Sequence, residues 1–436
     1  MQVSRRSFLQ YCAATAAAAA GLTLGGGGRR VAALDSAPKA TTAGTPTGRP
    51  NIVLIITDDQ DAPSLEVMRK LNDHPGGGWT QFDNAVCNDG ICAPSRATTL
   101  TGQHSHHHGV ERNGWIGKLD EHHTLPVWLS AAGYQCALFG KYSFGKKDHN
   151  WPKPPGWDVF DSGGGYADTV FGKGVDYIRH AGAEPFFLML TPVDPHIKAK
   201  PPLRYKDAEV EMSPLPPNIN EADVSDKPAR IRKLPLLRKS KLKSLAKERT
   251  NAYRTLLAVD DGVQAVVDEL AAVGKLDNTV IVYTSDHGFS WGSHRLERKH
   301  IPYEEVIRIP LVIRRPGQSG NRIESRVVSN VDIAPTLADL AGVTPTIAVD
   351  GYSLRPMMDG GDWTECKLIE KHFDTRDPGS FYGVRTDRYT YVEHDTGEKE
   401  LYDLAADPYQ MDSVHNDPGY AGARATLAGL LAGMKG

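Results

Sequence analysis

The fold of this chain is constrained most by three short apolar runs, rich in β-branched and aromatic residues, that lead into acidic and histidine side chains. The runs cover residues 51–56, 185–190 and 279–283. Apolar runs of this length without polar interruption are typical of strands buried on both faces of a parallel sheet. Helical patterns, such as residues 125–132 and 253–273, lie between them. This alternation predicts an α/β fold with a large, mostly parallel or mixed sheet sandwiched by helices.

The carboxyl-terminal part has a different pattern. From residue 349 onward, short alternating segments such as residues 382–385 and 389–392 are separated by turns. They predict a smaller α+β subdomain with an antiparallel sheet at residues 349–436, after a main domain at residues 51–348. The chain has 436 residues, 40% of them hydrophobic, which is enough for a large core. Its net charge of −3 provides no general attraction for nucleic acid, so no nucleic-acid partner is expected.

The amino terminus resembles an export signal. Ser4-Arg5-Arg6-Ser7-Phe8-Leu9 is a twin-arginine signature, and an alanine-rich apolar run follows at residues 11–24. We predict a signal peptide at residues 1–37, read by the twin-arginine translocase, and a Thr/Pro/Gly-rich linker at residues 38–50. A membrane anchor is the alternative, but a spanning helix needs about 20 strongly apolar residues. The protein is therefore expected to be exported, to the periplasm or outside the cell.

Acidic residues follow two of the predicted strands. Asp58 and Asp59 are adjacent, and two ionised carboxylates at the end of a buried strand repel each other unless a cation lies between them. Asp286 and His287 follow another strand, and the carboxyl ends of parallel strands meet at one edge of a sheet. A site dominated by carboxylate oxygens favours a hard divalent cation such as Ca²⁺ or Mg²⁺. An acidic pair that caps a helix is the alternative.

The segment Cys92-Ala93-Pro94-Ser95-Arg96 combines a nucleophile, a helix start and a permanent cation. A helix that starts at Pro94 places Cys92 near its amino end, where backbone N–H groups favour an anion. Arg96 adds a planar positive charge one turn inward. A disulfide between Cys87 and Cys92 is the alternative to a chemical role for Cys92.

This segment and the Leu100-Thr101-Gly102 stretch that follows it resemble the signature of the type I sulfatases, which belong to the alkaline phosphatase superfamily. Further segments stand in the order typical of that family, so the resemblance extends from residue 51 to the carboxyl terminus. They are residues 55–60, 140–142, 195–196, 284–288, 330–336 and 400–404, together with Lys299 and Asp407-Pro408. The resemblance implies an alkaline phosphatase-like fold and the hydrolysis of aryl or sugar sulfate esters.

In this family the motif cysteine is oxidised to formylglycine (3-oxoalanine), whose hydrate supplies the nucleophile. The resemblance therefore implies that Cys92 is the modified residue and that a formylglycine-generating maturation enzyme is a partner. It also places one metal ion per subunit, Ca²⁺ or else Mg²⁺, between residue 92 and the side chains of Asp58, Asp59, Asp286 and His287.

The resemblance assigns the cationic residues as well. Arg96 would stabilise the hydrated aldehyde, while Lys141, His196 and Lys299 would bind the sulfate oxygens and assist the leaving group. Preorganised positive charge around a tetrahedral anion is what in-line displacement requires. After transfer, a hemiacetal sulfate at residue 92 can expel sulfate once a base, for which His196 is a candidate, removes the second hydroxyl proton.

One position departs from the common family pattern. Ser143 stands where many members have a histidine, which affects one expected sulfate contact. The Gly140-Lys141-Tyr142 segment, with His106 and His108, is similar to the branch that contains glucosamine-6-sulfatases and related bacterial arylsulfatases. That similarity is a hint about the substrate and leaves both aryl and sugar sulfates open.

Three further features leave two interpretations open. The cluster of His104, His106, His107 and His108 is either a second metal site or a set of loop residues at the pocket entrance. We favour the loop, because no cysteine or carboxylate stands at zinc-ligand spacing. The Lys/Arg-rich segment 229–249 is either a solvated helix and loop or an anion-attracting rim over the site. The aromatic residues Trp151, Trp157, Phe160 and Tyr166 form either packing or a sugar platform.

Two other functions are compatible with this family resemblance. A phosphodiester or phosphonate monoester hydrolase would use the same modified cysteine. A catalytically inactive carbohydrate-binding relative would have lost Cys92, Arg96 or the acidic pairs, and all of these are present. The sequence therefore favours an active hydrolase.

Overall fold

The computed structural model describes residues 48–143, 152–363, 366–375 and 379–435. The strands of its main sheet are β1 (Asn51–Thr57), β2 (Trp79–Phe82), β4 (Gln135–Gly140), β5 (Val159–Asp161), β6 (Phe186–Thr191), β7 (Thr279–Ser285), β8 (Leu311–Arg314) and β9 (Arg322–Glu324). Their order is β5-β4-β6-β1-β7-β8-β2-β9. The strands from β5 to β7 in this order run parallel, and β8 runs antiparallel to both β7 and β2. The predicted α/β fold with a large mixed sheet is confirmed.

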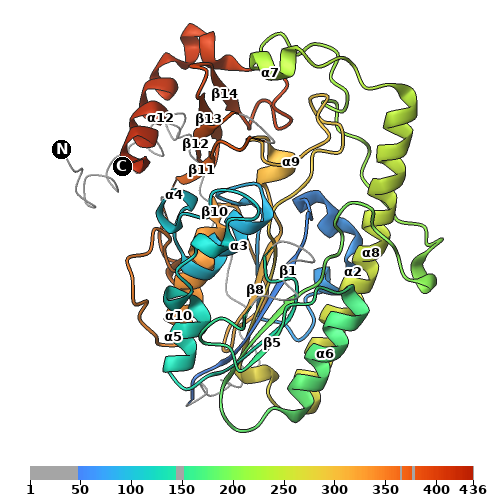
Figure 1. Cartoon of the computed structure of the whole chain (residues 1–436), viewed down its shortest axis with the longest axis vertical. Coiled ribbons are helices and arrows are strands. Elements are labelled where there is room, and N and C mark those ends of the chain that lie inside the picture. The colour runs from blue at the N-terminus through green and yellow to red at the C-terminus, as the bar shows by residue number, and fades with distance from the viewer. Residues whose placement is uncertain (1–47, 144–151, 364–365, 376–378, 436) are drawn as a thin grey trace, which may run out of the picture.

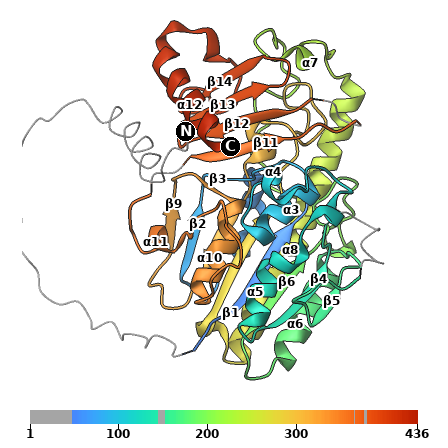
Figure 2. The ribbon, with the colours of Figure 1, turned by 60° about the vertical axis from the view of Figure 1, so that its left-hand side comes forward.

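Helices cover both faces of this sheet (Figures 1 and 2). One face carries α6 (Ala167–His180) and α8 (Lys239–Ala272), and the other carries α3 (Cys92–Thr101), α5 (Leu125–Ala131) and α10 (Ile333–Leu340). The shorter elements are α2 (Arg69–Asn72), β3 (Ala85–Val86), α4 (Ser105–His108), α7 (Ala229–Arg232), α9 (Glu304–Ile307), β10 (Val328–Ser329) and α11 (Arg355–Met358). Two layers of helices thus enclose the sheet.

Strand β1 explains why the sequence contains an unbroken apolar run. All of its residues are buried. Ile52, Leu54 and Ile56 belong to the core shared with α5 and α10, whereas Val53 and Ile55 belong to the core shared with α6 and α8. Successive side chains of a strand point to opposite faces, so a strand covered on both faces needs apolar residues at every position.

The carboxyl-terminal part forms a separate antiparallel sheet, which confirms that prediction. Its strands are β11 (Lys367–Lys371), β12 (Phe381–Arg385), β13 (Tyr389–His394) and β14 (Lys399–Asp403), and α12 (Ala421–Met434) packs on one face. A buried ion pair joins this sheet to the main domain, with Lys367 Nζ 2.9 Å from an oxygen of Asp332. A second pair joins Arg385 Nε to Glu304 Oε1 at 2.9 Å. The predicted domain boundary at 348/349 stays a prediction.

The predicted signal peptide and most of the predicted linker lie outside the described residues. Strand β1 begins at Asn51, where the sequence predicts the first strand. Among the helices of the described part, none combines the length and apolar character that crossing a membrane requires.

Candidate active site

The acidic residues that follow β1 and β7 meet at one edge of the main sheet. These two strands are parallel neighbours, and the register pairs Thr57 with Ser285 at their ends. Asp58 and Asp59 therefore leave the sheet beside Asp286 and His287. The backbone N–H of Asp59 donates to Asp286 Oδ1 at 3.1 Å, which fixes the two strand ends to each other. This convergence confirms the placement expected for the carboxyl ends of parallel strands.

Cys92 lies at the centre of this group. It is the first residue of α3 and only 1% exposed. Its Sγ lies 3.6 Å from Asp58 Oδ1, 3.4 Å from His287 Nε2 and 3.3 Å from Lys299 Nζ. The helix begins at Cys92 itself and not at Pro94 as predicted, so the thiol stands directly at the amino end of the helix.

The predicted cations surround the carboxylates. Lys141 Nζ lies 2.6 Å from Asp58 Oδ2, and Lys299 Nζ lies 2.5 Å from Asp59 Oδ1. Arg96 extends from the second turn of α3 to Asp286, with its Nε 2.9 Å from Oδ2.

Arg96 also holds a second strand end. Its Nη1 donates to the carbonyl oxygen of Lys141, directly after β4, at 2.7 Å. One guanidinium thus connects α3 to the ends of β4 and β7.

His196 lies on the open side of the site. It follows β6, and its Nε2 is 3.6 Å from Asp59 Oδ2. Its side chain is 39% exposed, unlike those of Asp58, Asp59 and His287, which are buried. The structure therefore brings all of the sequence-predicted site residues into one group, with His196 facing solvent.

The charges of the site stabilise an anion at position 92. Burial raises the pKa of the Cys92 thiol, but the ammonium groups of Lys141 and Lys299 outweigh it, so this pKa lies below its ordinary value. Burial also raises the pKa of Asp58, yet Lys141 holds it well below the usual range. For Lys299, burial lowers the pKa, and Asp59 together with Cys92 raises it well above the usual value. Both lysines thus remain charged beside ionised carboxylates.

The donor set fits a divalent cation. Asp58, Asp59, Cys92 and His287 each offer one ligand atom, and these atoms all lie within 4.8 Å of one another. Asp59 Oδ2 is buried and makes no hydrogen bond within the described residues, so it is available as a ligand. Asp286 lies next to this group, where its Oδ1 accepts hydrogen bonds from the backbone of Asp59 and of His287. Carboxylate oxygens with one imidazole suit a hard or borderline cation.

The alternative disulfide between Cys87 and Cys92 does not form. Cys87 and Cys92 are both free thiols and both are buried. The Sγ of Cys87 lies 3.7 Å from the carbonyl oxygen of Val306 and faces the core. Cys92 is thus available for chemistry.

Two residues that support the site were not predicted as such. Asn113 Oδ1 accepts a hydrogen bond from the backbone N–H of Ala93 at 2.9 Å and so anchors the start of α3. Asn330 Nδ2 donates to Ser95 Oγ at 2.9 Å. Asn330 stands in a segment that supports the family resemblance, whereas Asn113 stands in a loop without any motif.

The histidine cluster does not lie in a loop as predicted. Ser105–His108 forms the short helix α4, and His104 is the residue before it. His104 and His108 are buried, whereas His107 is exposed. Trp157 belongs to the core and Phe160 packs against it, as the packing interpretation expects. That interpretation is wrong for Tyr166, which is 48% exposed, and Trp151 lies outside the described residues.

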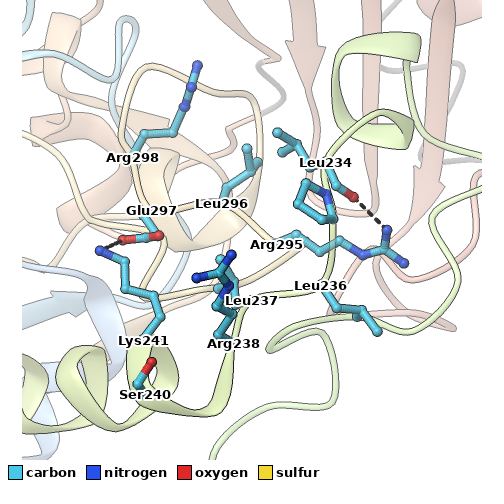
Figure 3. Close-up of a pocket in the computed structure, with 11 residues that line it drawn as sticks. Leu234, Leu236, Leu237, Arg238, Ser240, Lys241, Arg295, Leu296, Glu297 and Arg298 are labelled. Atoms are coloured by element: carbon cyan, nitrogen blue, oxygen red, sulfur yellow. Dashed lines mark hydrogen bonds and ion pairs between the residues drawn. The ribbon is translucent and has the colours of Figure 1, made fainter.

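The basic segment 229–249 borders a cavity of about 530 Å³ (Figure 3). The cavity is lined by Leu234, Pro235, Leu236, Leu237, Arg238, Ser240, Lys241, Arg295, Leu296, Glu297 and Arg298. Arg295 donates to three backbone carbonyl oxygens, and Lys241 pairs with Glu297 at 2.5 Å. Arg238 makes no side-chain hydrogen bond or ion pair to any described residue. Arg298 lines the same cavity and directly precedes Lys299.

Comparisons with known proteins agree with this geometry. The sulfatase family model matches residues 50–343, and the model of the carboxyl-terminal region of N-sulphoglucosamine sulphohydrolase matches residues 292–435. An arylsulfatase of Volvox carteri is 30% identical, over 90% of this chain and 75% of its own length. The N-acetylglucosamine-6-sulfatase of Homo sapiens is 30% identical, over 84% of this chain and 81% of its own.

Solved structures show the same fold. A protein in complex with its substrate D-glucosamine-2-N,6-O-disulfate superposes with a TM-score of 0.74 at 25% identity, over 89% of this chain and 97% of its own. A phosphonate monoester hydrolase of Agrobacterium radiobacter superposes with a TM-score of 0.76 at 23% identity, over 89% of this chain and 95% of its own length. At this identity, the comparison with the phosphonate monoester hydrolase shows a shared fold and not a shared activity. Because the sulfatase family model matches residues 50–343 and sulfatases are 30% identical over most of the chain, this chain belongs to the sulfatase family and is a sulfuric ester hydrolase.

Proposed function

We propose that this sulfatase hydrolyses a sulfate ester of a glucosamine-type sugar, with a formylglycine made from Cys92 as nucleophile and Ca²⁺ bound beside it. The observation that carries the proposal is the position of Cys92 Sγ, 3.6 Å from a carboxylate oxygen of Asp58 and 3.3 Å from Lys299 Nζ. This Sγ stands where an oxygen of the modified residue would lie. The sugar assignment is supported by relatives named N-acetylglucosamine-6-sulfatase and by the glucosamine disulfate bound to a protein of the same fold.

The side chains of this chain bind the sulfate group. Lys141 and Lys299 flank residue 92. Burial lowers the pKa of both, but Asp58 beside Lys141 and Asp59 beside Lys299 raise it above the usual value, so both keep their charge. They supply fixed positive charge to the equatorial oxygens as negative charge develops there. Arg96 holds the helix of residue 92 against the ends of β4 and β7, so the nucleophile is aligned before the substrate arrives.

His196 is placed to move protons. Its Nδ1 lies 3.1 Å from the carbonyl oxygen of Ile197, which leaves Nε2 facing Asp59 and the open side of the site. A histidine so placed can give a proton to the departing alcohol and take one when sulfate is released. A divalent cation between Asp58, Asp59, His287 and residue 92 would add Lewis-acid stabilisation of the sulfate oxygens.

Modification of Cys92 is tested by peptide mapping. Protein from the native host, or co-expressed with a formylglycine-generating enzyme, should give a residue-92 peptide with the mass of an aldehyde or its hydrate. The same protein should hydrolyse p-nitrophenyl sulfate, whereas Cys92→Ala should not. An unmodified thiol in fully active protein would refute the proposed nucleophile.

The substrate class is tested with a panel of anions. Glucosamine-6-sulfate and its N-sulfated and N-acetylated forms should give a higher kcat/KM than p-nitrophenyl sulfate. A phosphonate monoester and a phosphodiester should give the lowest values. A higher kcat/KM for the phosphonate monoester would overturn the substrate proposal and leave the nucleophile proposal intact.

We also propose export through the twin-arginine pathway. The support is the Ser4-Arg5-Arg6-Ser7-Phe8-Leu9 signature and the apolar run at residues 11–24. Replacing both arginines with lysine should leave the protein in the cytoplasm, as cell fractionation would report. Unchanged export of that variant would contradict the proposed route.

A further inference from the structure

A second group of potential metal ligands lies outside the candidate active site. His104, His106 and His107 each offer one ring nitrogen, and these nitrogens all lie within 4.8 Å of one another. The rings of His106 and His107 are the closest, with centroids 4.1 Å apart. None of these residues belongs to the group around Cys92.

Two carboxylates from distant parts of the chain complete this group. Asp350 Oδ2 lies 2.8 Å from His107 Nδ1 and accepts a hydrogen bond from the backbone of His104 at 2.7 Å. Glu370, in β11, lies 2.8 Å from His106 Nδ1 through its Oε2. These are the carboxylate partners that the sequence spacing did not reveal.

The carboxylates orient the imidazoles as metal sites require. A histidine that binds a metal through one ring nitrogen commonly donates its other N–H to a carboxylate, which sets the tautomer. With Nδ1 of His106 and of His107 held in this way, their Nε2 atoms carry the free lone pairs. His106 Nε2 is buried and makes no hydrogen bond to any described residue. Such a buried acceptor is costly unless something binds it.

We propose that His104, His106 and His107 bind a zinc ion, with Asp350 and Glu370 fixing the rings. Imidazole nitrogens suit zinc better than they suit the hard cation of the active site. Water supplies the fourth position, because Asp350 Oδ2 is already held on His107 Nδ1 and lies 3.7 Å from His104 Nδ1. The ion is structural, because it would join α4 to β11, which lie side by side in both views (Figures 1 and 2).

The primary test is zinc binding to the full-length protein. Chelator-treated protein is titrated with Zn²⁺ by calorimetry in excess Ca²⁺, which competes for the carboxylate-rich site. The wild type should bind one more Zn²⁺ per chain than the double variant His104→Ala/His107→Ala. The control variant His122→Ala/His180→Ala removes two histidines from the exposed surface and should bind as the wild type does. Equal stoichiometry in all three proteins would overturn the proposal.

Two further measurements test whether the bound ion lies on these three rings and not at another site. Asp350→Asn keeps all three rings and should weaken zinc binding by about 10- to 100-fold, the usual effect of losing a carboxylate behind a histidine ligand. Bound Co²⁺ should show tetrahedral d–d absorption without a thiolate charge-transfer band, because no cysteine belongs to this group. A thiolate band that disappears in Cys92→Ala would assign the ion to the active site and refute the proposal.

Discussion

Arg96 makes two contacts that no other cation could make from the same position. Its Nε reaches Asp286 Oδ2 at 2.9 Å and its Nη1 reaches the carbonyl oxygen of Lys141 at 2.7 Å. Arg96, Asp286 and Lys141 are all buried, so water does not replace either contact. The planar guanidinium therefore determines how α3 meets two strand ends.

Arg96→Lys should lower kcat/KM for sulfate ester hydrolysis by about 10²–10³-fold, the loss typical of removing one preorganised electrostatic contact. A lysine keeps the charge but has a single ammonium that cannot reach both Asp286 and the carbonyl of Lys141. Steady-state kinetics on p-nitrophenyl sulfate measure the effect. Arg69→Lys, at a pair whose arginine is 74% exposed, is the control and should be neutral. Full activity of Arg96→Lys would contradict this role.

Asp59→Asn should lower the affinity for the activating divalent cation by at least about tenfold, because hard cations are bound largely by ligand charge. The measurement is activity against free Ca²⁺, and separately Mg²⁺, after dialysis against a chelator. Asp168→Asn changes an exposed carboxylate and should leave the curve unchanged. Activity that survives the chelator in the wild type would show that no divalent cation is needed.

The acidic residues of the candidate site could be predicted because they stand in short local patterns, whereas Lys141, His196 and Lys299 could be assigned only through the family resemblance. Asp58-Asp59 and Asp286-His287 each follow an apolar run, and adjacent parallel strands bring such ends together. The carboxylate partners of the histidine cluster could not be predicted from the sequence, because Asp350 is 243 residues from His107 and Glu370 is 264 residues from His106. Only the folded chain makes such pairs neighbours.

Strand β13 carries an ion pair network that ties the last helix to the carboxyl-terminal sheet. Glu393 accepts hydrogen bonds from Lys399 and Lys435 Nζ, each at 2.8 Å, and from Tyr391. Burial raises the pKa of Glu393, but these hydrogen bonds lower it to about 2. Stability from this carboxylate is therefore complete above about pH 4.5 and is lost as the pH falls towards about 2.

Glu393→Gln should cost about 1 kcal/mol of unfolding free energy at neutral pH, after allowance for solvent screening. The difference from the wild type should disappear as the pH approaches about 2, the pKa of the folded state. Denaturant unfolding across this pH range gives the measurement. Glu209→Gln changes an exposed carboxylate and should show no such dependence. A difference that is constant with pH would exclude the ion pair as its source.

Arg238, the residue before α8, lines the cavity opposite the segment 295–298 (Figure 3). Arg238→Ala should lower kcat/KM for a multiply sulfated oligosaccharide by about two- to fivefold, the size of one exposed ion pair. For p-nitrophenyl sulfate, which carries one charge, the value should not change. Lys243→Ala, on the same helix but outside the cavity lining, is the control. Equal losses on both substrates would assign the effect to the active site.

Helix α8 also shows where prediction of elements from sequence fails. It spans Lys239–Ala272, whereas the apolar pattern predicts only residues 253–273. The first part of the helix is largely exposed and rich in lysine, so no apolar stripe marks it. The strands β1, β6 and β7 lie within one or two residues of their predicted ends, because burial on both faces leaves a clear signal.

Buried charges join the two sheets, so we expect the described part of the molecule to unfold in one transition. Lys367, at 4% side-chain exposure, pairs with the fully buried Asp332, and its ammonium lies 4.9 Å from the ring centre of Trp363. Removing one partner of a buried pair leaves an uncompensated charge. Loss of this contact should therefore affect the whole protein and not the small sheet alone.

Lys367→Ala should lower the free energy of unfolding by about 3–5 kcal/mol, the usual cost of breaking a buried ion pair. Scanning calorimetry should show a single transition in the wild type and a shifted one in the variant. Lys173→Ala breaks an exposed pair and should change little. Two resolved transitions in the wild type would show that the sheets unfold independently.

Cys92 is almost completely buried, which limits when an enzyme could reach its thiol during synthesis, folding and export. His287 and Lys299, which contact its sulfur, stand 195 and 207 residues later in the chain, so the ribosome exposes the cysteine long before it makes them. The enzyme that we propose to oxidise this thiol would therefore have to act during synthesis or on the unfolded chain. The twin-arginine translocase carries folded proteins, so with the proposed export route Cys92 would have to be oxidised in the cytoplasm. An enzyme that acted after folding would find the thiol buried and out of reach.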